Sequence, residues 1–83
     1  MGRTLMVDLH GMFRSDREIA KTVRSALFRA AGQKLESVEL IPGKGSGTLR
    51  RRVLAILEQP HLVKYYRRVE TDPGNEGRIL VYL

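Results

Sequence analysis

Two glycine-containing signatures constrain the fold of this chain more than any other feature of its sequence. The first is VDLHG at residues 7–11 and the second is PGKGSGT at residues 42–48; each closes a predicted strand and precedes a helical pattern. In a β-α-β unit the carboxyl ends of neighbouring parallel strands open onto one edge of the sheet, and ligands bind there. We therefore predict that the two signatures meet at one edge. The first brings a carboxylate and an imidazole, the second brings backbone amides and a cation, and this combination suits phosphate.

Length and charge narrow the class of protein. The 83 residues make one domain, which we expect to span residues 1–83. Fifteen Lys and Arg against nine Asp and Glu leave a net charge of +6, which attracts polyanions: nucleic acid first, an anionic membrane surface second. No apolar run approaches the roughly 18 residues that span a bilayer and no signal peptide is recognisable, so we expect no membrane partner and a cytoplasmic location. The absence of cysteine excludes disulfides and thiolate zinc sites.

Apolar periodicity predicts six elements in the order β-α-β-α-β-β. Strands are predicted over residues 4–9, 36–41, 64–70 and 78–83, and helices over residues 15–31 and 48–58. In the first strand Leu5, Val7 and Leu9 share one face, and the alternate residues Met6, Asp8 and His10 share the other. This order predicts an α/β fold of two layers (an α+β sandwich). Both helices cover one face of a four-stranded sheet, and the other face is partly open to water.

Local signals mark where these elements begin and end. Ser15 and Glu18 have the spacing of a capping box, in which each side chain accepts a bond from the other residue's backbone amide. Gly32 suits the left-handed position that ends a helix, and Pro60 is expected to end the second helix. Residues 72–77 (DPGNEG) are dense in turn formers and predict a hairpin between the last two strands.

Basic residues gather at two places in the predicted helices. Opposite the apolar stripe of the first helix lie Arg14, Arg17, Lys21 and Arg24. In the first turn of the second helix lie Arg50, Arg51 and Arg52. Cations at a helix N-terminus oppose the helix dipole at a cost of about 0.3–1 kcal/mol each, so we interpret the second group as a contact for an anionic partner. Arg14 is included among the predicted phosphate-binding residues. The alternative is a solvated face that happens to be basic.

The glycine loop fits an anion nest better than a nucleotide motif. Alternating glycines let successive N–H groups point inward, and the helix N-terminus adds roughly half a positive charge. The Walker pattern fails because Gly45 follows Lys44, and the dinucleotide pattern fails because Thr48 stands where its third glycine belongs. The residues predicted to bind phosphate here are Gly43, Lys44, Gly45, Ser46 and Gly47. A flexible strand-to-helix turn is the alternative.

Asp8 and His10 are two residues apart on a strand, so they can be neighbours on one face. An imidazole titrates near about pH 6.5, which suits a general acid or base, and a carboxylate beside it could orient it or hold a cation. Alternatively Asp8 accepts N–H bonds from the adjacent loop and His10 is a turn residue. His61 follows Pro60 and is predicted to be a surface residue. Two histidines without cysteine make a zinc site built from protein side chains improbable.

Both signatures resemble those of a known family. Residues 7–11 resemble the LDLHG signature of the Smr (small MutS-related) domain, and residues 43–49 (GKGSGTL) resemble its second signature, a glycine loop of the type HGxGxxxL. The resemblance implies a two-layer α/β fold similar to the C-terminal domain of translation initiation factor three, with a mixed sheet containing one antiparallel strand. It also implies nucleic-acid binding, often with nicking endonuclease activity. Carried over by position, the catalytic residues are Asp8 and His10, and the glycine loop with Lys44 contacts phosphate.

One departure from the family pattern matters for mechanism. Pro42 stands where many members have His or Thr, so a second active-site imidazole is missing. The leading hypothesis is an endonuclease that nicks DNA or RNA, with DNA favoured; no cofactor is required by the sequence, and Mg²⁺ or Mn²⁺ is the candidate. The alternative is a non-catalytic nucleic-acid-binding module, such as the C-terminal part of a larger MutS-related protein. A third hypothesis is a protein–protein adaptor. We expect the isolated domain to be a monomer.

Overall fold

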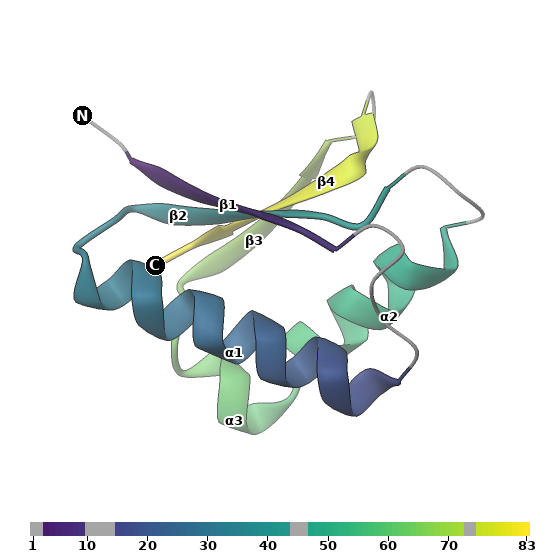
Figure 1. Cartoon of the computed structure of the whole chain (residues 1–83), viewed down its shortest axis with the longest axis horizontal. Helices are drawn as coiled ribbons and strands as arrows, with labels where there is room; N and C mark the ends of the chain where they lie inside the picture. The colour runs from purple at the N-terminus through teal and green to yellow at the C-terminus, as the bar shows by residue number, and fades with distance from the viewer. Residues whose placement is uncertain (1–2, 10–14, 44–46, 73–74) are drawn as a thin grey trace.

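A computed structural model describes residues 3–9, 15–43, 47–72 and 75–83, and these form four strands and three helices. In chain order they are β1 (Thr4–Asp8), α1 (Asp16–Gly32), β2 (Ser37–Ile41), α2 (Thr48–Leu57), α3 (Pro60–Val63), β3 (Arg68–Asp72) and β4 (Asn75–Tyr82). Figure 1 shows the sheet as one layer with α1, α2 and α3 beneath one of its faces. The predicted two-layer arrangement is confirmed, with α3 as an addition to it.

The sheet is mixed, with the strand order β1-β2-β4-β3. β1 and β2 are parallel, and β4 lies antiparallel between β2 and β3. Among the described strands β4 therefore runs against the other three, as the family resemblance implied. Parallel neighbours need a crossover connection, and α1 lies in the connection from β1 to β2. This topology brings the carboxyl ends of β1 and β2 to the same edge.

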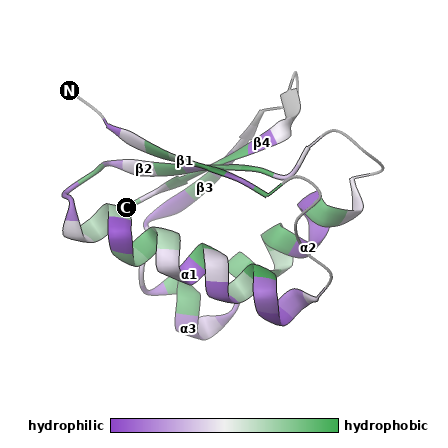
Figure 2. Ribbon diagram, viewed as in Figure 1, coloured by the Kyte–Doolittle hydropathy of each residue, from purple (hydrophilic) through white to green (hydrophobic). Residues whose placement is uncertain are grey.

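The core lies between the sheet and the helix layer. Figure 2 shows hydrophobic residues on the strands and on the helix surfaces that face them. The buried apolar residues are Leu9, Ile19, Val23, Ala26, Leu27, Ala30, Val38, Leu40, Val53, Ile56, Leu57, Leu62, Ile79 and Val81. The predicted alternation of β1 is confirmed: Leu5 and Val7 are half-buried, whereas Met6 is 64% exposed on the other face. The sheet thus presents its second face to solvent.

α1 begins as the sequence predicts. Ser15 is the N-cap with extended backbone, and its Oγ accepts a hydrogen bond from the Glu18 amide at 3.3 Å. This bond satisfies one of the amide groups that a helix leaves unpaired at its start. Asp16 and Glu18 add two carboxylates to the first turn, where they complement the helix dipole.

The left-handed residue that ends α1 is not the glycine predicted from the sequence. Gly32 lies within the last helical turn, and the left-handed residue is Lys34, with φ of 58°. The amides of Lys34 and Leu35 donate to the carbonyls of Ala31 and Ala30, which closes a Schellman motif. Leu35 packs against the core, and this contact sets the reversal one residue before it. Tertiary packing therefore places the turn at a lysine although a glycine stands two residues earlier.

Pro60 begins a helix as well as following one. α2 ends at Leu57, Gln59 precedes the new helix, and Pro60 occupies the first turn of α3. Proline is well suited to that position because the missing N–H has no intrahelical acceptor there. From the sequence Pro60 is predicted only to end the second helix, so α3 was not predicted. His61 lies in α3 and is exposed, as predicted.

β3 begins at Arg68, four residues later than predicted. The amides of Tyr65 and Tyr66 donate back to the carbonyls of Leu62 and Val63, so this segment is a turn that leaves α3. Adjacent tyrosines favour a strand by propensity, but tertiary contacts win here. The Tyr65 ring packs on Phe28 of α1 with 4.7 Å between ring centroids, which holds the segment in the helix layer.

The predicted hairpin between β3 and β4 is confirmed, and its strands extend further than expected. The pairing continues to Asp72 opposite Asn75, with a register shift between Thr71 and Asp72. A bulge of this kind lets a strand pair continue through residues that favour turns. β4 therefore starts three residues before the predicted strand.

Candidate functional site

The carboxyl ends of β1 and β2 lie side by side. Asp8 ends β1 and is the register partner of Ile41, which ends β2. The Leu9 amide donates to the Ile41 carbonyl at 2.8 Å, so the pairing continues one residue beyond the end of β1. Both signatures therefore depart from adjacent backbone positions, at the edge where β1 and β2 end in Figure 1. The shared edge predicted from the sequence is present, and we call it the β1–β2 edge.

Asp8 lies on the exposed face of β1 at the β1–β2 edge. Its side chain is exposed, and the following residue, Leu9, is completely buried in the core. Strand alternation explains this contrast, because consecutive side chains point to opposite faces. His10 and Arg14 lie outside the described residues. The pairing of Asp8 with His10 and the phosphate contact of Arg14 therefore stay predictions.

The glycine loop leaves β2 through a buried proline and enters α2 through a left-handed glycine. Pro42 is buried, Gly43 has φ of 91°, and Gly47 has φ of 83° at the N-cap of α2. No atom of the described residues lies within 4 Å of a Cβ built on Gly47, so its backbone conformation is what requires glycine. The other three predicted phosphate ligands of the loop lie outside the described residues; they are Lys44, Gly45 and Ser46.

The start of α2 combines cations with the absence of a side-chain cap. Gly47 supplies no side-chain hydrogen bond, and the first turn contains no acidic residue. Arg50 is half-buried, and its Nε atom is buried without a hydrogen-bond partner in the described part of the chain. Arg51 is exposed. Buried guanidinium N–H groups without partners are costly, so this environment favours an anion that approaches the helix start.

Arg52 has a different role from its neighbours. Its Nε donates to Asp16 Oδ1 at 2.7 Å, which joins the N-terminal part of α2 to the first turn of α1. The side chains are 32% and 68% exposed, so this ion pair adds at most about 1 kcal/mol to stability. Arg52 is thus occupied by a carboxylate, whereas Arg50 and Arg51 form no ion pair with a described residue.

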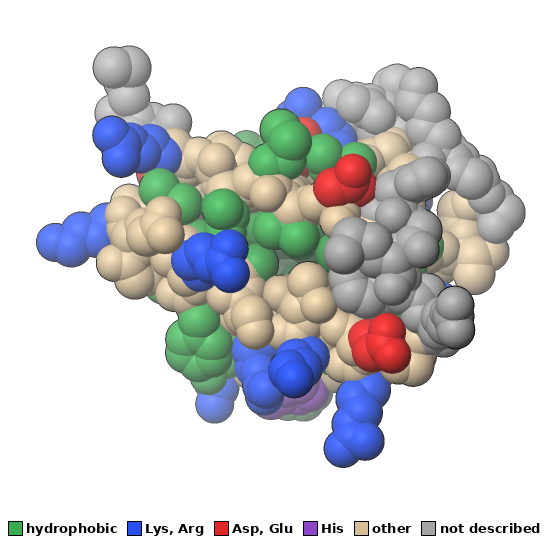
Figure 3. All heavy atoms as spheres, in the orientation of Figure 1, with side chains coloured by type: hydrophobic (Ala, Val, Ile, Leu, Met, Phe, Trp, Pro, Cys, Tyr) green, Lys and Arg blue, Asp and Glu red, His purple; other side chains and the backbone are tan. Residues whose placement is uncertain are grey.

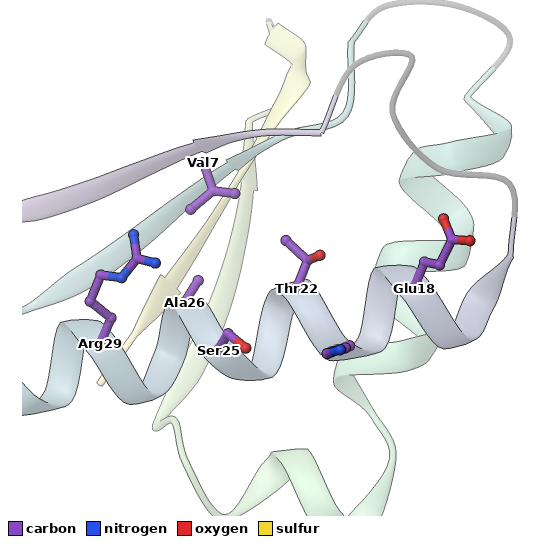
Figure 4. Close-up of a pocket in the computed structure, with 7 residues that line it drawn as sticks. Val7, Glu18, Thr22, Ser25, Ala26 and Arg29 are labelled. Atoms are coloured by element: carbon purple, nitrogen blue, oxygen red, sulfur yellow. The ribbon is translucent and has the colours of Figure 1, made fainter.

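A groove of about 500 Å³ runs along the outer side of β1, between that strand and α1. In Figure 4 Val7 points from β1 toward the helix, and Thr22 points from α1 toward the sheet. The residues that line it are Val7, Glu18, Lys21, Thr22, Ser25, Ala26 and Arg29. Sequence reasoning missed this groove because an edge strand and a distant helix face form it together. The signal available was the pair of small polar residues, Thr22 and Ser25, beside the apolar stripe.

The described residues provide no ready-made metal centre. No three His, Cys, Asp or Glu side chains among them are grouped so that they could hold a metal ion. A divalent cation at the β1–β2 edge would be coordinated by the Asp8 carboxylate and by groups of the nucleic acid itself, as Mg²⁺ commonly is. Within the same residues, no helix is long and apolar enough to cross a bilayer.

Comparison with known proteins places the chain in a family. The Smr domain model matches residues 7–83. Endonuclease MutS2 of Solidesulfovibrio magneticus is 36% identical over 85 residues, a match that covers 99% of this chain and 10% of that longer protein. The crystal structure of the Smr domain of Thermus thermophilus MutS2 superimposes with a TM-score of 0.77 at 28% identity, covering 94% of this chain and 95% of that one. This chain belongs to the Smr domain family.

Proposed function

We propose that this Smr domain binds DNA at the β1–β2 edge and nicks its phosphodiester backbone. The observation that supports the proposal most is the register pairing of Asp8 with Ile41. It sets a solvent-facing carboxylate beside the segment that leads through two left-handed glycines into the cationic start of α2. A carboxylate and an anion-binding helix start at one edge suit attack on a bound phosphate. The name of the MutS2 relative is consistent with this activity.

In this proposal the start of α2 holds the phosphate. Backbone amides of the glycine loop and of the first helical turn point at the anion, and the helix dipole adds to their field. Arg50 and Arg51 contact the same or the neighbouring phosphate. The donors of the first helical turn belong to a formed helix, so in this proposal they stabilise the charge that develops on the phosphate in the transition state.

Asp8 and His10 supply the proton chemistry in the proposal. His10 acts as general base or general acid, and Asp8 orients its imidazole or holds a divalent cation. A bound Mg²⁺ or Mn²⁺ would polarise a phosphoryl oxygen and lower the pKa of a coordinated water. General acid–base catalysis of this kind contributes a factor of about 10²–10⁴ to the rate.

Nicking of supercoiled plasmid tests the proposal directly. We expect the domain to convert supercoiled DNA to open circles with Mg²⁺ or Mn²⁺, and His10→Ala to slow that conversion by a factor of about 10²–10⁴. Asp8→Asn should also slow it, whereas Glu36→Gln, which removes an exposed carboxylate at the other end of β2, should not. Wild-type rates in His10→Ala would remove His10 from the chemistry.

A non-catalytic binding module is the second candidate function. Pro42 favours it, because this position is buried and offers no imidazole where many members of the family have His or Thr. Under this alternative the domain binds DNA with a strong salt dependence but leaves plasmid intact. Asp8→Asn and His10→Ala would then leave the affinity nearly unchanged.

A further inference from the structure

The solvent-facing side of α1 carries a basic stripe that the proposed function leaves unused. Arg17, Lys21 and Arg24 follow one another at helical spacings of four and three residues, so they share one face of the helix. The opposite face buries Ile19 and Val23 in the core. All three cations are exposed. From Arg17 to Arg24 the stripe is about 10 Å long, which matches roughly three phosphates along a DNA strand.

A hollow between α1 and α3 sits within this stripe. It encloses about 250 Å³ and is lined by Arg17, Ala20, Lys21, Arg24 and His61. We call it the basic hollow. In Figure 3 blue Lys and Arg side chains gather around the purple histidine at the lower face, over α1 and α3. Ala20 leaves room at its floor, and no carboxylate lines it.

The cations of the basic hollow are not neutralised by the described part of the protein. The ion pairs among the described residues join Arg52 to Asp16, Arg68 to Glu70 and Arg78 to Glu39. Arg17, Lys21 and Arg24 take part in none of them. Like charges three or four residues apart weaken a helix by about 0.2–0.5 kcal/mol per pair, so this arrangement costs stability when nothing is bound. An anion in the hollow would remove that cost.

We propose that the basic hollow is a second DNA-backbone contact, separate from the β1–β2 edge. This inference rests on the proposed function, because it concerns the same DNA. α1 starts beside the start of α2, where Asp16 meets Arg52, and its basic stripe then runs along the outside of the helix layer. A backbone held at the edge is therefore followed by further cations on a different face of the molecule. The hollow takes a phosphate of a neighbouring DNA segment, with His61 as an additional N–H donor.

Salt-dependent DNA binding by matched variants tests this inference. We would measure the affinity for a fluorescent DNA duplex at several salt concentrations with the double variant Lys21→Gln/Arg24→Gln. Lys34→Gln/Arg67→Gln is the matched control, because it removes one exposed Lys and one exposed Arg outside the hollow. Each lost phosphate contact lowers the slope of log affinity against log salt by about 0.9. We therefore expect the first variant to lose about two from the slope and to bind several-fold more weakly than the control.

Two further measurements separate this inference from the proposed function. The edge variant Arg50→Gln/Arg51→Gln should weaken binding independently, and DNA should shift the amide NMR signals of Ala20 and His61 in the wild-type protein. Equal slopes and affinities in the hollow variant and its control would overturn the second contact, while weakened binding in the edge variant would leave the proposed function standing. Salt-independent or absent binding by the wild-type protein would overturn both. Circular dichroism confirms that each variant is folded.

Discussion

The two long helices of this domain start in opposite ways. α1 has a serine cap, whose Oγ accepts the Glu18 amide, and two carboxylates in its first turn. α2 has a glycine cap without a side-chain hydrogen bond and three consecutive arginines at its third to fifth positions. Side-chain caps and acidic residues stabilise a helix N-terminus, whereas cations destabilise it. The N-terminus of α1 is therefore favourable by these local rules and that of α2 is unfavourable.

The contrast separates a helix start that contributes stability from one that suits binding. α1 satisfies one of its first amide groups through Ser15, and its two carboxylates complement the helix dipole. α2 has no side-chain hydrogen bond from its N-cap and no acid in its first turn, and it starts near the β1–β2 edge beside Asp8, where an incoming anion would complement its dipole. The ion pair between Asp16 and Arg52 connects the two starts, since an acid of α1 neutralises one of the three arginines of α2.

Replacing each of two glycines by alanine should change the free energy of unfolding most, and in opposite directions. Gly47 has φ of 83° and Gly32 lies within α1, and in the part of the chain that the structure describes no atom lies within 4 Å of a Cβ added to either. The left-handed conformation costs an L-residue about 1–2 kcal/mol, so Gly47→Ala should lower the free energy of unfolding by that amount. Gly32→Ala should raise it by about 0.4–1 kcal/mol. Urea denaturation measures both, and a stabilising Gly47→Ala would contradict the assigned role of the loop backbone.

Removing the cap of α1 should have the next largest effect. Ser15→Ala deletes the acceptor of the Glu18 amide and is expected to cost about 1 kcal/mol of stability. DNA affinity should not change at temperatures where the variant is folded, because Ser15 belongs to the helix start that is already satisfied. Urea denaturation and DNA titration of the same sample check the two statements. A loss of affinity without a loss of stability would show that α1 also binds DNA through its cap.

The C-terminal end of α2 provides a third test, because there a side chain hydrogen-bonds to one of the last backbone carbonyls of the helix. Tyr66 donates its hydroxyl hydrogen bond to the Leu57 carbonyl at 2.6 Å. Tyr66→Phe should therefore cost about 0.5–1.5 kcal/mol near neutral pH. Tyr65→Phe is the matched control, because its hydroxyl makes no hydrogen bond with the described residues.

The same substitution should change the alkaline stability of the domain. Burial, together with the charge of Glu58, raises the pKa of Tyr66 above its usual value of 10.0. In the unfolded chain the tyrosine ionises first, so its contribution to stability is complete below about pH 10 and is lost as the pH rises through the raised pKa. Wild-type protein should thus lose more stability above about pH 10 than Tyr66→Phe does. Parallel losses in the two proteins would contradict this.

The framework of the fold was predictable because it depends on local patterns. Alternation in β1 and the parallel connection through α1 are enough to place Asp8 beside the end of β2. Three details were wrong or missed: the residue that ends α1, the helix α3, and the start of β3. Each depends on tertiary packing, such as Leu35 against the core and Tyr65 against Phe28. Local propensity is weaker than these contacts.

The candidate site was predictable in its outline and not in its pairing. The positive φ of Gly47 at the start of α2 and the exposure of Asp8 follow from residue type and strand alternation. That Arg52 would be occupied by Asp16 does not follow, because the partners are 36 residues apart and meet only when both helices are packed. Likewise the basic hollow needs α3, which the sequence reasoning did not predict.

Exchanging charges between the two helix starts should have the smallest effect on stability and the most direct effect on binding. Arg51 is exposed, so Arg51→Glu gives α2 an acid like those of α1 and should raise the free energy of unfolding by about 0.5 kcal/mol. The mirror change in α1, Glu18→Arg, should lower it by a similar amount. Only the first should weaken DNA binding and reduce its salt slope, because it replaces a cation by an acid where a phosphate is proposed to bind, whereas the second removes no cation. If Arg51→Glu stabilises the domain while DNA affinity is unchanged, the cations at the start of α2 do not serve binding. Phosphate binding at the β1–β2 edge would then not explain why α2 carries cations that destabilise its N-terminus.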